Sequence, residues 1–441
     1  MRQRTSANDA APVAEKNRIQ SLDILRGVAL LGILLLNIPE FSLPQRYSEA
    51  FRSDAGTLNF WIRAVVLALF EGKMRALFSI LFGAGILLFI ANKKAPAKTT
   101  ILLFYRRMFW LVLFGLADAH LLLWIGDILY CYGIIGMAAF LFRKMRPGYL
   151  VLAIPIVAIA EFAVQTSFYQ DIRNKRLAYV STANGLKPGQ MPTARQKETI
   201  AAWREIEISF LPNDKDVAEK TAIMQSDYAR IAKMIRKESW AYQTTYLLYG
   251  IWDPLALMLM GMALMKWGFI TGRCSRKKYL VIAIIGYAVG LPLVIYELFF
   301  TYKYIPDLAA SFRLMEQTPV PWRNFIYPVQ RMALVLAHVS VIMLMIRAGW
   351  FGRAFRNLAA VGQMAFTNYV MQTVFCSLFF FGYGLNYYNR LSYYEVFYIV
   401  FAIWLLQLVY SPLWLRCFYF GPLEWLWRLL TYWKWPPFKR K

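Results

Sequence analysis

The fold is decided by residues 58–91, which read LNFWIRAVVLALFEGKMRALFSILFGAGILLFIA. The second part, 74–91, is apolar and approaches the roughly 20 residues that a helix needs to cross about 30 Å of hydrocarbon. The first part, 58–72, is shorter and contains Arg63. A full crossing by both parts would deliver the lysines after residue 91 to the outer side, against the positive-inside rule. We therefore expect 58–72 to be a re-entrant or interfacial helix on the outer side, and 74–91 to be the second crossing.

Similar apolar stretches recur along the whole chain. Because the N-terminal residues are basic, we place them in the cytoplasm, and the connectors rich in Lys and Arg then also fall in the cytoplasm. The sequence predicts an all-α polytopic integral membrane protein of the cytoplasmic (inner) membrane, with about ten transmembrane helices, one re-entrant or interfacial helix and both termini cytoplasmic. The expected crossings cover about residues 28–41, 74–92, 101–122, 126–142, 148–168, 246–267, 279–301, 326–346, 359–382 and 393–415.

Composition supports the membrane class. Of 441 residues, 59% are hydrophobic, and the mean hydropathy is +0.41, which a soluble protein of this length rarely sustains. The net charge of +25 arises at helix ends, so membrane lipids, and not nucleic acid, are the expected partner of the basic residues. With four Cys at no ligand-like spacing and two His, we expect no metal site.

Five regions follow from these patterns. The expected regions are a polar cytoplasmic tail (1–20), a first transmembrane half with five crossings (21–168), an extracytoplasmic helical insertion (169–243), a second transmembrane half with five crossings (244–431) and a basic cytoplasmic tail (432–441). Within the insertion, helices are expected around 193–210 and 216–240.

Charged side chains at membrane depth cost at least about 2.5 kcal/mol each on insertion scales, so each needs a reason. Asp23 and Arg26 are three residues apart on one helix face, which allows an ion pair. The pair is either a structural feature of the cytoplasmic rim or a site where Arg26 binds phosphate, whose oxygens match the guanidinium fork.

A second polar group is expected near the outer ends of the first two crossings. It is either solvated at the interface by snorkelling side chains or forms an outward-facing cup that binds an acceptor. The candidate substrate-binding residues there are Asn37, Glu40, Glu71 and Lys73, with Arg75 beside them.

His120 and Asp127 flank the outer turn between the third and fourth crossings. A turn at Gly126 would fold Asp127 back toward His120, and a His oriented by a carboxylate is a suitable general base. The alternative for His120 is a residue that caps a helix end at the interface. His338 lies in the middle of a crossing and is expected to form a hydrogen bond between helices.

Other polar residues lie inside the second half. Asp253 precedes Pro254, and Pro292 interrupts the crossing that contains Glu297; such breaks often line cavities. Asp253, Glu297 and Arg331 are candidates to face one cavity. Asn368 and Gln372 share a helix face, and they either line the same cavity or bond neighbouring helices. Glu424 and Arg428 have the spacing of an ordinary helical ion pair.

Several phrases resemble the YeiB-like family of bacterial polytopic membrane proteins, over about residues 20–431. The phrases are LDILRG at 22–27 with LNI at 36–38, GK at 72–73 with LFSILFGAG at 77–85, GDILY at 126–130, GQMAFTNY at 362–369 with Gln372, and GPLEWLWR at 421–428. We interpret the GAG at 83–85 as a point of close helix packing.

The opening LDxxRG also resembles the first helix of transmembrane acyltransferases such as heparan-glucosaminide N-acetyltransferase. That resemblance implies acetyl-CoA or another acyl-CoA as a donor reached from the cytoplasm, and an envelope glycan or related small-molecule acceptor outside. Those enzymes have a His shortly after the first helix, whereas residues 27–92 of this chain contain none.

Two functions therefore follow. The first is an acyltransferase, in which Arg26 binds donor phosphate and His120 with Asp127 activates the acceptor. The second is a transporter of a small solute, with Asp253, Glu297 and Arg331 along its path.

Overall fold

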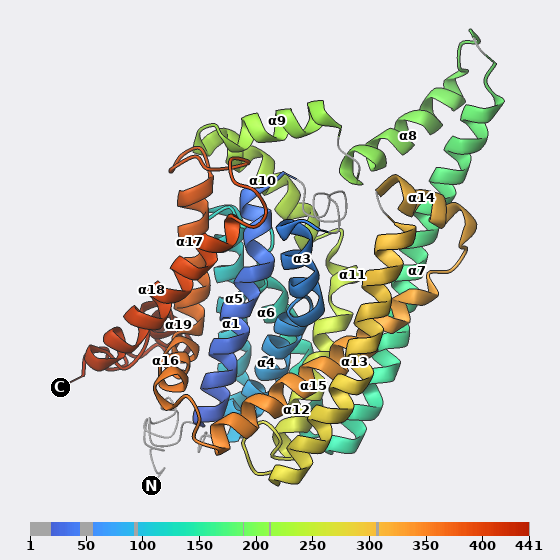
Figure 1. Ribbon diagram of the computed structural model, residues 1–441. Helices are drawn as coiled ribbons and strands as arrows, with labels where there is room; N and C mark the ends of the chain where they lie inside the picture. The colour runs from blue at the N-terminus through green and yellow to red at the C-terminus, as the bar shows by residue number, and fades with distance from the viewer. Residues whose placement is uncertain are drawn as a thin grey trace.

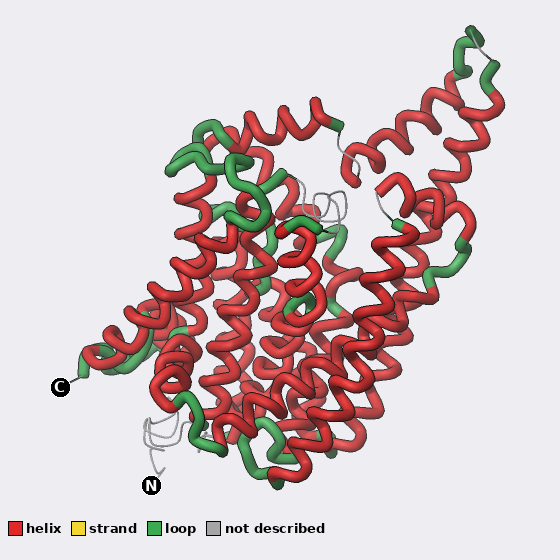
Figure 2. The backbone as a smooth tube through the Cα atoms, in the orientation of Figure 1, coloured by secondary structure: helices red, strands yellow, loops and turns green. Residues whose placement is uncertain are grey.

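The computed structural model describes residues 19–44, 56–91, 96–187, 189–210, 213–305 and 308–440. Its described residues form helices and loops, and their sole β feature is an isolated bridge between Phe418 and Lys439 (Figure 2). The prediction of an all-α membrane protein is confirmed. The N-terminal residues 1–18, and Lys93 and Lys94 in the first basic connector, lie outside the described part, so the structure does not place them.

The helices follow one another along the chain in a regular succession with short connectors. In order they are α1 (Gln20–Ser42), α3 (Leu58–Leu69), α4 (Lys73–Ala91), α5 (Ala97–His120), α6 (Leu129–Ala139), η2 (Phe140–Lys144), α7 (Pro147–Gly185), α8 (Ala194–Phe210), α9 (Asp214–Met224), α10 (Tyr228–Gln243), α11 (Leu247–Gly250), α12 (Trp252–Lys266), α13 (Arg276–Tyr304), α14 (Leu308–Gln317), η3 (Trp322–Phe325), α15 (Ile326–Arg347), α16 (Gly352–Gln363), α17 (Ala365–Phe380), α18 (Val396–Cys417) and α19 (Pro422–Tyr432).

Within the described part of the chain, eight helical segments are long and apolar enough to cross a membrane. Two of the ten predicted crossings are shorter: α6 has 11 residues before it continues as η2, and α17 has 16. The chain is thus compatible with a multi-pass membrane protein, and the count of ten stays a prediction. In the orientation of Figure 1, we call the side of the bundle where α1 begins the lower side and the opposite side the upper side.

The decisive stretch forms one broken crossing. Figure 1 shows α3 above α4, with the chain descending from the first to the second, and the two lie within one 34-residue apolar segment. Between them Gly72 has a φ of 71°, and a Cβ there would overlap the Tyr327 hydroxyl of α15. Only glycine fits both constraints. The structure joins 58–72 and 74–91 into one apolar segment, so the expected re-entrant or interfacial helix stays a prediction. In Figure 1, α4 leads to the side where α1 begins.

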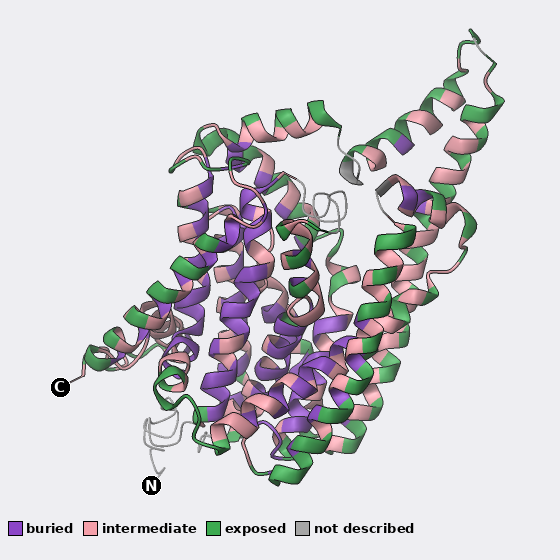
Figure 3. Cartoon of the chain, in the orientation of Figure 1, coloured by how far each residue is buried: buried purple, intermediate pink, exposed green. Residues whose placement is uncertain are grey.

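Close helix packing surrounds this broken crossing. A Cβ on Gly83 of α4 would overlap the Met258 carbonyl of α12, and a Cβ on Gly261 of α12 would overlap the Ile80 carbonyl of α4. Small residues let two backbones approach in this way. The interpretation of Gly83 as a packing residue is therefore confirmed. Figure 3 shows that buried residues concentrate in the central helices, among them α1, α4 and α12, whereas α7 and α13 carry many exposed ones.

The polar insertion has two parts on the upper side. In the first, α7 extends past the bundle and packs with α8 and α14 around Trp203 (Figure 1). In the second, α9 and α10 lie over the upper ends of the central helices, where α10 buries Ile231 and Ile235. The predicted helix 193–210 corresponds to α8. The predicted helix 216–240 is divided in two because Asp227 caps the start of α10 by accepting a hydrogen bond from the Arg230 N–H.

Candidate functional site

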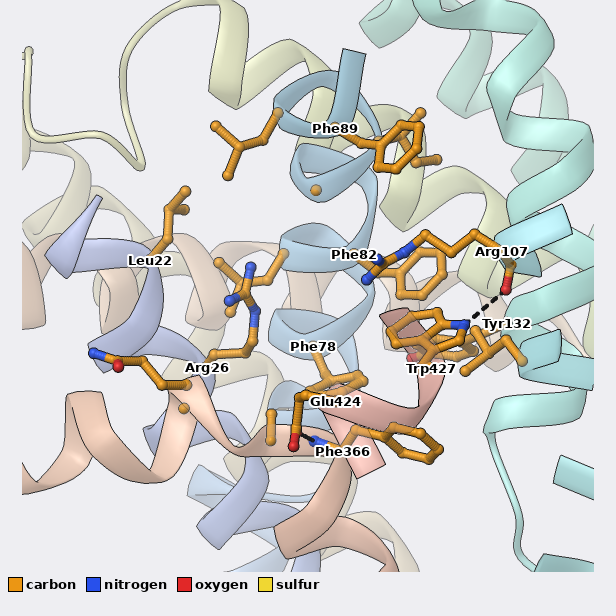
Figure 4. A pocket seen from close by; sticks show the side chains of 18 of the residues that line it. Leu22, Arg26, Phe78, Phe82, Phe89, Arg107, Tyr132, Phe366, Glu424 and Trp427 are labelled. Atoms are coloured by element: carbon orange, nitrogen blue, oxygen red, sulfur yellow. Dashed lines mark hydrogen bonds between the residues drawn. The ribbon is translucent and has the colours of Figure 1, made fainter. Parts of the chain in front are cut away.

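A cavity of about 270 Å³ lies among α1, α4, α5, α6, α17 and α19 (Figure 4). Arg26 stands six residues into α1 and Arg107 ten residues into α5, so at about 1.5 Å per residue both lie in the lower half of the bundle. The residues that line the cavity include Asp23, Arg26, Phe78, Phe82, Arg107, Leu129, Tyr132, Tyr369, Glu424, Trp427 and Arg428.

Three arginines line this cavity. Arg26 pairs with Asp23 at 3.0 Å, which confirms the predicted ion pair. The Arg107 guanidinium carbon lies 3.6 Å from the ring centre of Trp427, and Arg428 stacks on Phe420 at 4.1 Å. Stacking occupies the faces of a guanidinium and leaves the N–H donors at its edge directed sideways. Such arginines suit an anionic ligand.

Glu424, on the cavity wall, caps the start of α17. Its Oε1 accepts hydrogen bonds from the backbone N–H groups of Phe366 at 2.7 Å and Thr367 at 3.0 Å, and its Oε2 accepts one from the Thr367 hydroxyl at 2.6 Å. Burial raises the pKa of Glu424, and the hydrogen bonds that it accepts oppose the rise. The sequence suggested an ordinary helical pair with Arg428. Instead, Glu424 joins the stretch GPLEWLWR at 421–428 to GQMAFTNY at 362–369.

Tyr132 of α6 also lines the cavity. The Tyr132 hydroxyl lies 2.5 Å from Oγ of Ser79 and 3.5 Å from the Arg75 carbonyl oxygen, and Ser79 also donates to that carbonyl at 3.0 Å. Tyr132 therefore connects the cavity wall to the backbone of α4 at Arg75. The side chain of Arg75 belongs to a second polar group.

That second group lies around Asp253 of α12. Its carboxylate forms a buried ion pair with Arg331 of α15 and lies 3.8 Å from Arg75, whose side chain is 49% exposed. Glu161 of α7 is within electrostatic reach of all three. Met74 and Ala76, on either side of Arg75, are buried, whereas the Arg75 side chain is partly exposed beside the broken crossing. We call Asp253, Arg331, Arg75 and Glu161 the Asp253 cluster.

The predicted polar cup is only partly assembled. Lys73 donates to the Leu67 carbonyl at 2.8 Å, where a cation is favourable at the end of α3. Glu71 lies in the turn between α3 and α4. Asn37 and Glu40 are half-buried near the upper end of α1. Gly32 of α1 lies beside Met74. Asn37 and Glu40 come later in α1, so they lie roughly 7 to 12 Å above the level of Met74.

His120 and Asp127 have different partners, so the predicted pair is not formed. Nε2 of His120 lies 2.8 Å from Oε1 of Gln243 in α10. The Asp127 carboxylate accepts the backbone N–H groups of Leu129 at 3.1 Å and Tyr130 at 2.9 Å, because it caps the start of α6. This corrects the expected geometry, and the catalytic roles of both residues stay predictions.

The three residues predicted to face one cavity belong to two ion pairs. Asp253 and Arg331 pair within the Asp253 cluster, whereas Glu297 pairs with Arg323 at 2.7 Å. This part of the prediction is wrong, because η3 places Arg323 beside Glu297.

The remaining predicted residues join helices. Asn368 donates to the hydroxyl of Ser411, and Gln372 donates to Gln407, so both bond α17 to α18, which was one of their two alternatives. His338 bonds the Tyr287 hydroxyl and the Leu69 carbonyl oxygen, at 3.0 Å each. Its predicted role between helices is confirmed.

Sequence reasoning missed Arg107, Asp118, Tyr132 and Glu161. Arg107, Asp118 and Glu161 are ionisable residues within apolar stretches, and that signal alone would have singled them out. Tyr132 has no such signal, because tyrosine is common in membrane helices; its position is apparent only from the packing of α6 against α4.

Comparison with known proteins identifies relatives of the chain. Residues 264–434 match the family model described as a protein of unknown function (DUF418). Uncharacterized protein YxaH of Bacillus subtilis is 29% identical, with 98% of each chain covered. Uncharacterized protein YeiB of Escherichia coli is 28% identical, over 93% of this chain and 95% of its own. Nearly the whole chain is thus similar to YeiB and YxaH, and residues 264–434 match the DUF418 family model.

The DUF418 match covers only some of the residues that line the cavity. Glu424, Trp427 and Arg428 lie within it, whereas Arg26 and Arg107 lie in the first half, which only the nearly full-length relatives match. No solved structure matches the YeiB-like chain significantly.

Proposed function

We propose that this YeiB-like protein is a transmembrane acyltransferase. It takes an acyl group from acetyl-CoA or another acyl-CoA at the lower side and transfers it to an envelope glycan or related acceptor at the upper side. In this proposal the protein lies in the bacterial inner membrane with both termini cytoplasmic, so the lower side is the cytoplasm. The observation that carries the proposal is that a basic cavity and the Asp253 cluster approach Tyr132 from two directions.

The donor side rests on charge and shape. Arg26, Arg107 and Arg428 supply guanidinium groups that suit the phosphates of coenzyme A. On the same cavity, Phe78 and Phe82 supply an apolar wall for a thioester arm. The volume of about 270 Å³ is near the lower end of the roughly 300–1,000 Å³ of ligand pockets, so the cavity suits a slim chain whose charged head remains near the arginines.

The acceptor side rests on the Asp253 cluster. Asp253 and Glu161 offer carboxylate oxygens, and Arg75 offers a partly exposed guanidinium. Groups of both kinds hydrogen-bond the hydroxyls of a sugar. Of the residues predicted to bind substrate, Asn37, Glu40, Glu71 and Lys73 remain candidates along this route, whereas Asn368 and Gln372 are assigned to the joint between α17 and α18.

The proposed reaction is a direct transfer. A hydroxyl or amine of the acceptor attacks the thioester carbonyl carbon, the new C–O or C–N bond forms, and the C–S bond breaks. Ser79 donates its hydrogen to the Arg75 carbonyl, so in the resting protein Tyr132 donates its hydrogen to Oγ of Ser79. In the proposed reaction the Tyr132 O–H turns from Ser79 to the thioester carbonyl oxygen, where it stabilises the negative charge that develops. The proton lost by the acceptor balances the proton gained by the thiolate.

Calorimetry with purified protein and acetyl-CoA tests the donor site. The wild type should bind acetyl-CoA, and Arg26→Ala and Arg107→Met should each weaken binding strongly. Arg353→Met is the matched control, because Arg353 is exposed on α16 and does not line the cavity. Absence of binding of acetyl-CoA and of free coenzyme A to the folded wild type would contradict the proposal.

Transport is the second candidate, favoured by one observation. The broken crossing of α3 and α4 places charged residues at its break, as discontinuous helices of transporters do. Solute flux into proteoliposomes, combined with no binding of any acyl-CoA, would favour transport.

A further inference from the structure

Two carboxyl groups face each other where the end of α5 meets the start of α6, next to Tyr369 of the cavity wall. Asp118, near the upper end of α5, is 1% exposed, and it interacts with the side chain of Asp127, just before α6. Gly115 allows the approach, because a Cβ there would lie 2.5 Å from Oδ2 of Asp127. No ion pair among the described residues involves either carboxyl.

The hydrogen bonds distinguish the two groups. Asp127 accepts two backbone N–H groups at the start of a helix, which favours its charged form. Asp118 accepts only the Thr373 hydroxyl, at 3.4 Å, and its Oδ1 has no hydrogen-bond partner among the described residues. Two buried carboxyl groups that hydrogen-bond each other do not both ionise. With a proton on its unpartnered Oδ1, Asp118 becomes a hydrogen-bond donor, and the Asp127 carboxylate accepts that bond.

Tyr369 connects this pair to the cavity. Its hydroxyl oxygen accepts hydrogen bonds from the indole N–H of Trp124 at 3.1 Å and from the Ile128 N–H at 3.2 Å. Its own hydrogen is therefore available to Asp127, with which it interacts. Tyr369 also lines the cavity. Trp124 stacks on Phe41 with ring centres 4.1 Å apart, so large aromatic side chains cover the pair.

We propose that Asp118 and Asp127 together bind one proton and exchange it with the cavity through Tyr369. The other polar or titratable groups that face the pair are Tyr130 and Cys131 of α6 and Tyr369 and Thr373 of α17.

The role of this proton rests on the proposed function. As the C–S bond of the acyl-CoA breaks, the stored proton passes through the Tyr369 hydroxyl to the thiolate sulfur, which becomes a thiol. The proton released by the acceptor hydroxyl or amine then restores the pair. Atoms and charges balance, and no further reactant is needed. Asp118 and Asp127 act through Tyr369 and are positioning residues.

Infrared spectroscopy of the purified full chain tests the proton without any acyl donor. At neutral pH the wild type should show a carboxylic-acid C=O band that is absent in Asp118→Asn and present in the control Asp171→Asn, whose carboxylate is exposed on α7 and pairs with Lys175. If Asp118→Asn fails to fold, Tyr369→Phe should shift the same band. The proposal would be overturned if the infrared spectrum of the wild type, in the region of the carboxylic-acid C=O band, is the same as that of folded Asp118→Asn or folded Tyr369→Phe.

A second measurement tests the role. Asp118→Asn should bind acetyl-CoA like the wild type but transfer acyl groups roughly 100-fold more slowly, as expected for loss of acid–base assistance. An unchanged transfer rate would overturn the role even if the infrared band is present. If the wild type binds no acyl-CoA, the proposed function fails while the infrared result still decides whether the pair holds a proton.

Discussion

The hydroxyl of Tyr132, which lines the basic cavity, lies 2.5 Å from Oγ of Ser79. Both hydroxyls also approach the carbonyl oxygen of Arg75, whose side chain belongs to the Asp253 cluster. Tyr132 thus links the cavity wall to the backbone of Arg75 in the Asp253 cluster. In the proposed acyltransferase, this link is where donor and acceptor would meet.

Removing the Tyr132 hydroxyl should separate binding from transfer. Tyr132→Phe keeps the ring that packs on Phe78 and Phe82, so the affinity for acetyl-CoA should stay unchanged. If the hydroxyl stabilises the developing oxyanion, the transfer rate should fall by roughly 100-fold. Radiolabelled acetyl transfer in membranes measures this rate.

The control for that experiment is Tyr105→Phe, because the Tyr105 hydroxyl bonds the Met137 carbonyl and Tyr105 does not line the cavity. A Tyr132→Phe protein that transfers acetyl groups as fast as Tyr105→Phe would remove Tyr132 from the mechanism.

Gly83 and Gly85 of α4 should respond oppositely to alanine. A Cβ at Gly83 would overlap the backbone of α12, whereas at Gly85 it would meet no atom within 4 Å. Gly83→Ala should therefore lose about 1–3 kcal/mol of stability through overpacking, and Gly85→Ala should gain up to about 1 kcal/mol through helix propensity. Thermal unfolding in detergent compares the two variants. Equal melting temperatures would contradict the packing of α4 against α12.

Glu424 should make stability depend on pH. Burial raises its pKa above the ordinary value of 4.5, so the folded protein holds this proton more tightly than the unfolded chain does. Its contribution is fully present below pH 4.5 and is lost as the pH rises through the folded-state pKa, by at most about 1.4 kcal/mol per pH unit.

The isosteric variant Glu424→Gln should lack this decline while still accepting hydrogen bonds from the start of α17. Melting temperatures of both proteins over a range of pH measure the difference. Parallel curves for the wild type and Glu424→Gln would show that the carboxyl does not titrate with folding.

The ion pair of Asp253 and Arg331 should be costly to break on one side only. Arg331→Met leaves a buried carboxylate without its closest partner, which costs roughly 3–5 kcal/mol. The double variant Asp253→Asn with Arg331→Met removes both charges and should recover much of that loss. Denaturation of the three proteins provides the comparison, and a double variant less stable than Arg331→Met would contradict the pairing.

Much of the fold was predictable because apolar length and basic connectors constrain a membrane chain strongly. The expected arrangement of 58–91 followed from Arg63 and from the lysines after α4. What the sequence did not reveal is that α3 and α4 share one crossing, since this depends on the space that Tyr327 leaves for Gly72.

The site was less predictable. The pair of Asp23 and Arg26 is a local contact on one helix and followed from spacing. By contrast, Arg107 stacks on Trp427, 320 residues along the chain from it, and Asp118 faces Asp127 only because α5 and α6 approach closely at Gly115. Contacts between distant segments depend on packing, and no spacing rule predicts them.

The most direct test of the account is the sidedness of transfer. Acetyl-CoA labelled in the acetyl group is supplied to sealed inner-membrane vesicles, either everted, with the cytoplasmic face outward, or right-side-out. The account predicts labelled glycan within the everted vesicles, no labelling of right-side-out vesicles, and no labelling in everted vesicles that carry Arg107→Met. Labelling that requires acetyl-CoA on the upper side, or that persists without Arg107, would contradict it.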